Sequence, residues 1–246
     1  MKLSYQCPYC MKESFAKFPS QSLIFRVDHQ QLDDSCIHPI TCPEGHLFAM
    51  VFNGSKFEVL FDIALNAISD GYFREAVSSF SASLERFFEF FINYVMYQNL
   101  KGNSEFDKAW RSVKNQSERQ LGAYIFVYLY KYSSFPCILT QEQSNFRNKV
   151  IHKGYIPTKQ EAIDFGEVVY TCIMEVIKKI EQGEERQLSE FYNKSLPTIT
   201  GYECTLTMNP KGISLNSKYK NSKLPEPTRC KPYSLILKSF KLNTEF

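Results

Sequence analysis

Long hydrophobic runs are missing from this sequence. No stretch of about 18 apolar residues occurs in its 246 residues, which argues against a membrane-spanning helix. The opening segment, MKLSYQCPYC, also lacks the apolar core of a signal peptide, so we expect a cytoplasmic location. In that reducing compartment, the eight cysteines are expected to be thiols or metal ligands rather than disulfides.

A large excess of positive or negative charge is also missing. The formal net charge is +3 and there is no basic tail, so the sequence permits an anionic partner without requiring one. Tryptophan occurs once, but 21 phenylalanines and 15 tyrosines supply aromatic side chains. With a hydrophobic content of 43%, these side chains predict a packed core and argue against a disordered chain.

The first region, residues 1–58, is predicted to be a small β domain. It contains two Cys-Pro pairs and three of the four histidines. Two runs of aliphatic and aromatic residues, at 23–27 and 47–52, are typical of short strands.

The second region, residues 59–186, is predicted to be a bundle of about five helices. Its apolar residues recur at helical spacing, and it contains only two prolines. Thr140 and Thr158 are followed three residues later by Gln143 and Glu161, the pattern of a capping box at a helix start. The predicted helices span residues 61–68, 72–97, 117–132, 140–154 and 158–185.

The third region, residues 187–246, is predicted to be a β-rich extension. Five prolines interrupt it, and runs of alternating character occur at 203–208 and 233–237. The predicted fold class is therefore mainly α: a helical bundle with a small N-terminal β domain and a β-rich C-terminal extension.

Four potential metal ligands come in two pairs within the first region. Two residues separate Cys7 from Cys10, and three separate Cys42 from His46, so each pair can form a tight turn with its donors on one side. Thiolates and a neutral imidazole suit tetrahedral Zn²⁺ better than a hard cation. The arrangement resembles a zinc ribbon in which histidine replaces the fourth cysteine, and we expect a structural zinc ion.

Two alternatives to this ligand set remain open at the level of the sequence. Cys36 and His38 lie close to the second pair and could replace one ligand. The simpler alternative is a set of buried thiols with a surface histidine and no metal.

A short segment, Arg147 to His152, carries a second kind of chemistry. Histidine can transfer protons near neutral pH, since its unperturbed pKa is about 6.5, and arginine presents a charged fork that matches phosphate oxygens. Asn148 can hold the imidazole or a phosphate oxygen. These groups suit RNA cleavage by the ribose 2′-hydroxyl without a catalytic metal.

The spacing of this pair limits how it can act. Arg147 and His152 lie five positions apart, about 140° around a helix axis. They can share a cleft if the helix end bends or if two subunits face each other. Without further evidence, a surface pair or a partner of the helix dipole is the alternative.

The pattern R-N-x-x-x-H at Arg147, Asn148 and His152 resembles the signature of the HEPN domain family. The following residues, KGYIPTKQEAI, are similar to the turn and final helix of that family, and Glu85 matches its acidic helix position. The resemblance covers roughly residues 59–186.

This resemblance implies a metal-independent endoribonuclease that acts as a homodimer, with two motifs forming one site. Arg147, Asn148, His152 and Glu85 would be its catalytic residues. Many members act in toxin–antitoxin or antiviral systems, so an antitoxin or sensor partner is expected besides the RNA substrate. Since some members lack activity, the alternative is a non-catalytic RNA- or protein-binding module.

Side chains around the motif have two interpretations each. Lys149 and Lys153 are predicted to contact RNA phosphates, with ordinary solvated lysines as the alternative. Glu85 and Glu89 could orient the Arg-His pair, or form a surface charge cluster with Arg86.

Overall fold

In a computed structural model, the protein forms two compact units. The N-terminal unit comprises residues 1–53 and 196–209, and the helical unit comprises residues 54–195 and 210–246. The structure describes residues 2–17, 28–31, 33–35, 37–100, 103–195, 200–203, 205–211, 213, 215, 233–234 and 236–237.

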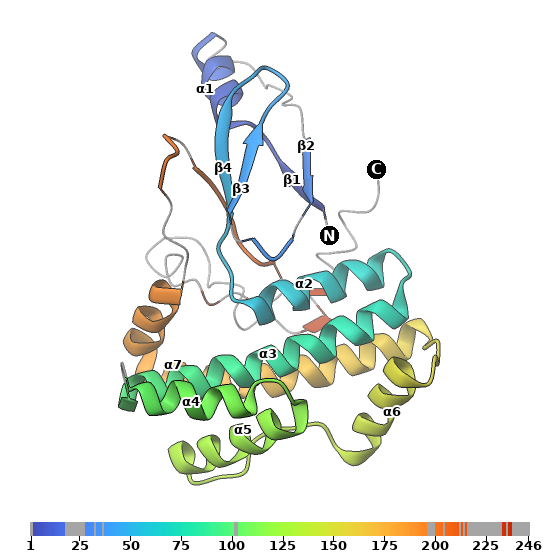
Figure 1. Ribbon diagram of the computed structural model, residues 1–246. Coiled ribbons are helices and arrows are strands. Elements are labelled where there is room, and N and C mark those ends of the chain that lie inside the picture. Colours follow the sequence, from blue (N-terminus) through green and yellow to red (C-terminus); the bar gives the residue numbers. More distant parts are fainter. Residues whose placement is uncertain are drawn as a thin grey trace. The chain divides into compact units, whose positions relative to one another are not determined.

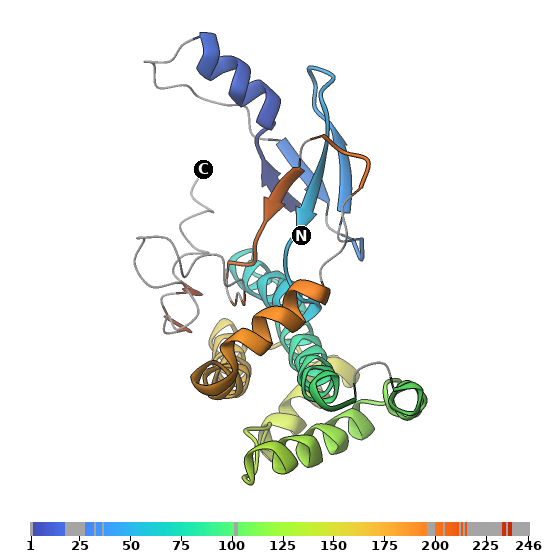
Figure 2. The ribbon, with the colours of Figure 1, turned by 90° about the vertical axis from the view of Figure 1, so that its left-hand side faces the viewer.

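A three-stranded sheet forms the core of the N-terminal unit. Strand β3 (Ile37–Thr41) pairs antiparallel with β4 (Leu47–Phe52), and β5 (Thr205–Met208) pairs parallel with β4 (Figure 2). Five of the six β4 side chains are buried, as expected for a central strand. The strand predicted at 47–52 is thus confirmed, and the run at 203–208 is a strand from Thr205 to Met208, whereas Glu203 lies in a bend.

A second, two-stranded sheet and one helix complete this unit. Strand β1 (Lys2–Tyr5) pairs antiparallel with β2 (Asp28–Gln31), and α1 (Pro8–Lys17) begins directly after Cys7. Helix α1 was not predicted, although Pro8 at its first position is a start signal. The strand predicted at 23–27 lies outside the described residues.

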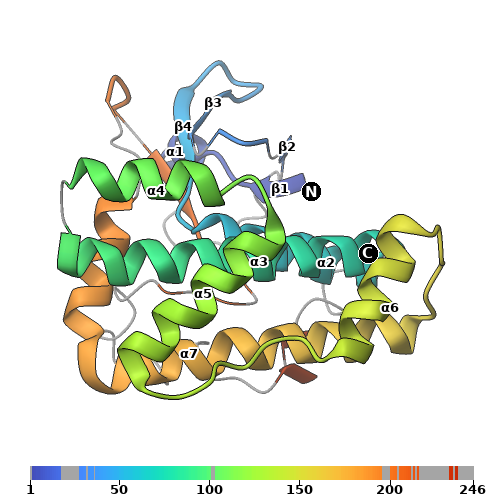
Figure 3. The ribbon, with the colours of Figure 1, turned by 60° about the horizontal axis from the view of Figure 1, so that its bottom comes forward.

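The helical unit contains six described helices, one more than the predicted five. Long helices α3 and α7 lie alongside each other, and α5 and α6 lie on one side of them (Figures 1 and 3). The helices are α2 (Lys56–Ser69), α3 (Phe73–Leu100), α4 (Ser104–Val113), α5 (Ser117–Tyr132), α6 (Gln141–His152) and α7 (Lys159–Ser195).

Local capping explains several of these boundaries. Thr140 and Gln143 form a capping box at the start of α6, as predicted. Thr158 accepts a hydrogen bond from the backbone of Glu161, whose side chain accepts one in return, so α7 begins in the same way. The unpredicted helix α4 is capped by Asn103, whose side chain accepts a hydrogen bond from the Glu105 backbone.

Aromatic side chains fill the interior of the helical unit. Phe57 packs against Phe87 with ring centroids 5.2 Å apart, and Phe61 packs against Phe80 at 5.0 Å. Since α3 contributes a buried face to several neighbours, it is the central helix of the bundle. Glu85 of α3 forms an ion pair with Arg147 of α6.

The third region differs from the prediction. The helix predicted to end near 185 is interrupted at Glu184, whose φ of −138° and ψ of 30° are not helical. A further helical segment then continues α7 to Ser195, where no helix was predicted, and the described residues 233, 234, 236 and 237 are helical rather than extended. Only β5 among the described residues is a strand there. Tertiary packing overrides the alternating pattern at 233–237, because Tyr233, Ile236 and Leu237 are all buried.

No helix among the described residues is long and apolar enough to cross a membrane. This finding agrees with the absence of long hydrophobic runs in the sequence.

Two buried carboxylates hold the chain after β5 against α2. Glu58 accepts hydrogen bonds from the Leu215 backbone (2.6 Å) and the Tyr192 hydroxyl (3.0 Å), and Asp62 accepts one from the Lys211 backbone (2.7 Å). Burial raises the pKa of Glu58 to about 7, in spite of its hydrogen bonds. The folded state therefore binds a proton more tightly than the unfolded state.

This buried carboxylate predicts a pH-dependent stability. Because the folded pKa lies above the unfolded one, the contribution of Glu58 is present at low pH and is lost as pH rises through about 7. From pH 6 to pH 8 we expect it to lower the free energy of unfolding by about 1 kcal/mol. Urea unfolding followed by circular dichroism should show this slope in the wild type. Glu58→Gln should flatten it, whereas exposed Glu105→Gln should keep it; equal slopes in all three proteins would contradict the assignment.

Candidate active site and metal centre

The four predicted metal ligands converge within the N-terminal unit. The donor atoms of Cys7, Cys10, Cys42 and His46 all lie within 4.8 Å of one another. The Cys10 and Cys42 sulfurs are 3.9 Å apart, and His46 Nδ1 lies 3.4 Å from Cys10, 3.5 Å from Cys42 and 3.8 Å from Cys7. Tetrahedral zinc bonds require S···S and S···N separations of about 3.8 and 3.6 Å. The donor set therefore fits a zinc ion.

Each pair of ligands is shaped by local backbone structure. At the first pair, the Met11 N–H donates to the Cys7 carbonyl at 3.0 Å, so Cys10 projects from the first turn of α1. At the second pair, Gly45 adopts φ +83° and donates its N–H to the Cys42 carbonyl at 2.8 Å. Glycine suits this left-handed conformation, which folds His46 back beside Cys42.

Neighbours of His46 orient its ring. The Nε2 atom lies 3.2 Å from the Glu13 carboxylate, and Tyr9 stacks on the imidazole with centroids 5.2 Å apart. Since Nε2 faces the carboxylate, Nδ1 is presented to the three sulfurs. Histidine ligands of zinc are commonly oriented by such a carboxylate, so Glu13 and Tyr9 are supporting residues that the sequence analysis missed.

The thiols of the cluster differ in acidity. Burial raises the pKa of Cys10, together with its contact to Cys7, to about 12. Burial also acts on Cys42, but hydrogen bonds from the backbone of His46 and Glu44 outweigh it and lower that pKa to about 7. A bound zinc ion would stabilise the thiolates. Four protein ligands leave no open position, which suits a structural ion rather than a catalytic one.

The alternative ligands take no described part in the cluster. His38 is buried on β3, and its Nδ1 lies 3.8 Å from Asp33. Cys36 lies outside the described residues.

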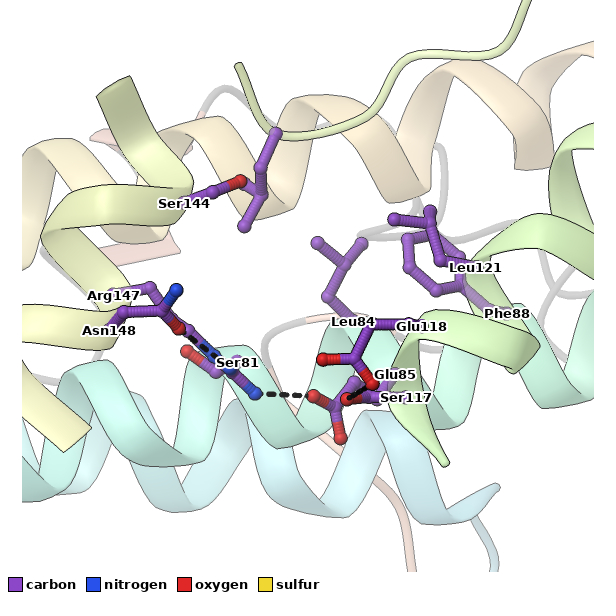
Figure 4. Close-up of a pocket in the computed structure, with 11 residues that line it drawn as sticks. Ser81, Leu84, Glu85, Phe88, Ser117, Glu118, Leu121, Ser144, Arg147 and Asn148 are labelled. Carbon is purple, nitrogen blue, oxygen red and sulfur yellow. Dashed lines mark hydrogen bonds and ion pairs between the residues drawn. The ribbon is translucent and has the colours of Figure 1, made fainter. Parts of the chain in front are cut away.

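In the helical unit, three predicted site residues meet beside a cleft between α3, α5 and α6 (Figure 4). The Arg147 guanidinium donates to the Glu85 carboxylate at 2.6 Å and to the Asn148 side-chain oxygen at 2.9 Å. Both partners of the ion pair are about a quarter exposed, at 23% and 29%. The guanidinium is thus held in a fixed orientation at the surface of the cleft, where a phosphate could reach it.

His152 does not join this group within one chain. It is exposed at the last position of α6 and is not among the described residues that line the cleft. Helix α6 is regular through its end, so no bend brings the imidazole toward Arg147. Within one chain, Arg147 and His152 therefore do not share the cleft.

The two flanking lysines differ in their surroundings. Lys149 Nζ lies 3.6 Å from the centre of the Tyr155 ring, whose hydroxyl donates to Glu161 at 2.9 Å. Lys153 is exposed at the C-cap of α6, just before Gly154 with φ +69°. Both side chains are exposed, and Lys149 additionally lies over the Tyr155 ring.

The cleft also contains residues that the sequence did not single out. Glu118 of α5 lines it, together with Ser144 one helical turn before Arg147. Periodicity along α6 could have placed Ser144 near Arg147, but no local pattern links Glu118 to this site. Glu89, the alternative to Glu85, instead pairs with Arg86 at 2.5 Å.

Comparison of this chain with family models, curated proteins and solved structures found no match in any of the three. The resemblance to HEPN domains therefore rests on the residues and motifs described above.

Proposed function

We propose that this protein is an endoribonuclease of the HEPN type that cleaves RNA without a catalytic metal. The observation that carries the proposal is the Arg147 guanidinium, held by Glu85 and Asn148 in an accessible cleft. A guanidinium fixed in this way can bind the scissile phosphate and stabilise the charge that grows on it. Glu85 is a positioning residue in this mechanism.

His152 supplies the proton chemistry. One imidazole takes the proton of the ribose 2′-hydroxyl as that oxygen attacks phosphorus, and the second imidazole, or water, protonates the leaving 5′-oxygen. Asn148 orients the phosphate, and Lys153 contributes charge along the RNA backbone. Because His152 is exposed and lies outside the cleft, these roles require a homodimer in which two motifs face each other.

An apolar face of α5 supports such a homodimer. Phe126, Leu129 and Tyr130 project from this helix with exposed fractions of 73%, 46% and 78%, and Phe135 follows with 68%. The three aromatic side chains together expose on the order of 450 Å², which is comparable to the largest apolar patches of typical monomers, and such patches are often functional. The same helix lines the cleft through Leu121, more than one helical turn before Phe126.

The proposed homodimer makes a specific prediction about this face. Phe126→Glu places a charge in the buried centre of the interface and should weaken the dimer by about 100-fold or more, since an unpaired buried charge is costly. Sedimentation equilibrium would measure the dissociation constant. Tyr72→Glu alters another exposed aromatic residue, outside the face, and should leave the dimer intact. A monomeric wild type with full activity would refute the proposal.

The resemblance also suggests the biological setting, an antiviral or toxin–antitoxin system with an antitoxin or sensor partner. In that setting, the zinc-ribbon-like part of the N-terminal unit would stabilise the fold or bind the partner or RNA. The cytoplasm is the expected location.

A single assay separates this proposal from a non-catalytic binding module. The purified chain is incubated with total RNA, with and without EDTA, and the new RNA ends are sequenced. Cleavage that survives EDTA and is absent in His152→Ala supports a metal-independent ribonuclease. RNA binding without cleavage would favour the binding module.

A further inference from the structure

The cleft beside Arg147 has the size and lining of a site for one flat ring. Its volume is about 230 Å³, and four apolar side chains line it: Leu84, Phe88, Leu121 and Leu139. Sites for drug-sized ligands measure about 300–1,000 Å³, so this cleft suits a single planar ring system better than a larger ligand. Apolar side chains can cover the faces of a nucleobase, which leaves its edge for polar groups.

The two sides of the cleft carry one charged residue each, of opposite sign. Arg147 and Asn148 come from α6, whereas Ser117 and Glu118 come from the start of α5 (Figure 4). Among the contacts of the described residues, the Glu118 carboxylate accepts only the Ser117 hydroxyl, at 3.4 Å. The Glu85 carboxylate, by contrast, is already bound to Arg147. Glu118 therefore keeps acceptor capacity for a ligand, and it repels a phosphate.

A nucleotide in the cleft would be oriented by this polarity, with its phosphate toward Arg147 and the N–H donors of its base toward Glu118. Guanine carries N1–H and the 2-amino group side by side, so both oxygens of one carboxylate can accept from the same edge. Adenine and cytosine place a ring acceptor beside their amino group, and uracil places its single N–H between two carbonyls.

We propose that this cleft binds a guanine base, with Glu118 as the residue that selects it. In the reaction, this site would set the cleavage position next to a guanosine. That role rests on the proposed ribonuclease function. As a binding site for the base, however, it can be tested without any cleavage.

The binding test compares five nucleoside monophosphates on the full-length protein by calorimetry. GMP should bind at least roughly 10-fold more tightly than AMP, CMP or UMP, because it makes two hydrogen bonds to a charged acceptor. IMP, which lacks the 2-amino group, should bind more weakly than GMP. Glu118→Gln should remove most of the preference, whereas Glu105→Gln, an exposed site on α4, should preserve it. Equal affinities for all five nucleotides would overturn the inference.

A cleavage test then separates this inference from the proposed function. Single-stranded RNAs with one guanosine in a uridine background should be cut beside the guanosine, and replacement by adenosine should slow cleavage about 10-fold or more. Cleavage without base preference, together with equal nucleotide affinities, overturns the guanine site and leaves the ribonuclease. GMP preference without any cleavage overturns the ribonuclease and leaves a guanine-binding site. No binding and no cleavage overturn both.

Discussion

Replacing Arg147 or His152 by alanine is expected to lower the rate of RNA cleavage by about 10²-fold or more. In the proposed mechanism, the loss of Arg147 removes the group that holds the phosphate and stabilises its developing charge, and the loss of His152 removes proton transfer. Arg147→Lys should also lose most activity, because an ammonium cannot replace the fork that Glu85 holds at 2.6 Å. Initial rates on a defined RNA measure each effect.

The same mechanism fixes the products of the reaction. Since the proposed nucleophile is the internal 2′-hydroxyl, we expect the 5′ fragment to end in a 2′,3′-cyclic phosphate or its opened form. A 2′-deoxy residue at the cut site should block cleavage. Mass spectrometry of the fragments distinguishes these ends from a 3′-hydroxyl, which would rule out this chemistry.

The control for these variants is the exposed residue Lys159, at the start of α7 and outside the motif. Lys159→Ala should retain nearly full activity. All variants should keep the helical circular dichroism of the wild type, because Arg147 and His152 are accessible rather than in the core. Full activity in His152→Ala would leave the binding module as the better explanation.

Loss of the zinc ion is expected to unfold the N-terminal unit. The cluster of Cys7, Cys10, Cys42 and His46 joins the start of α1 to the turn before β4, so the ion would link segments more than thirty residues apart. Free energies of zinc binding in small domains are about 10–16 kcal/mol, much of which becomes folding free energy. Elemental analysis of protein never exposed to chelator should find about one zinc per chain.

The test of this role is a cysteine variant and its matched control. Cys42→Ser should lose the zinc and expose the strands of the N-terminal unit to hydrogen exchange, measured by mass spectrometry. Cys137→Ser makes the same chemical change at a partly exposed site in the helical unit, outside the cluster, and should keep the zinc. Protein that contains no zinc from the start would contradict the assignment.

Local features of the sequence were sufficient to predict several parts of the structure. The capping boxes at Thr140 and Thr158 act within one helical turn, so the starts of α6 and α7 could be identified without the rest of the fold. The two ligand pairs likewise depend on short turns, such as the one at Gly45. Their convergence into one cluster followed from the preference of zinc for four donors.

Other features depended on contacts between distant segments, which only the tertiary structure decides. Glu85 lies 62 positions before Arg147, and the packing of α6 beside α3 is what brings their side chains to 2.6 Å. Glu118 of α5 lines the same cleft, and no local sequence pattern predicts this position. Strand β5 joins β4 from more than 150 residues away, and burial made residues 233–237 helical where they are described, in spite of their alternating pattern. Periodicity shows which face of an element is apolar, but the partner of that face is chosen by packing across the whole chain.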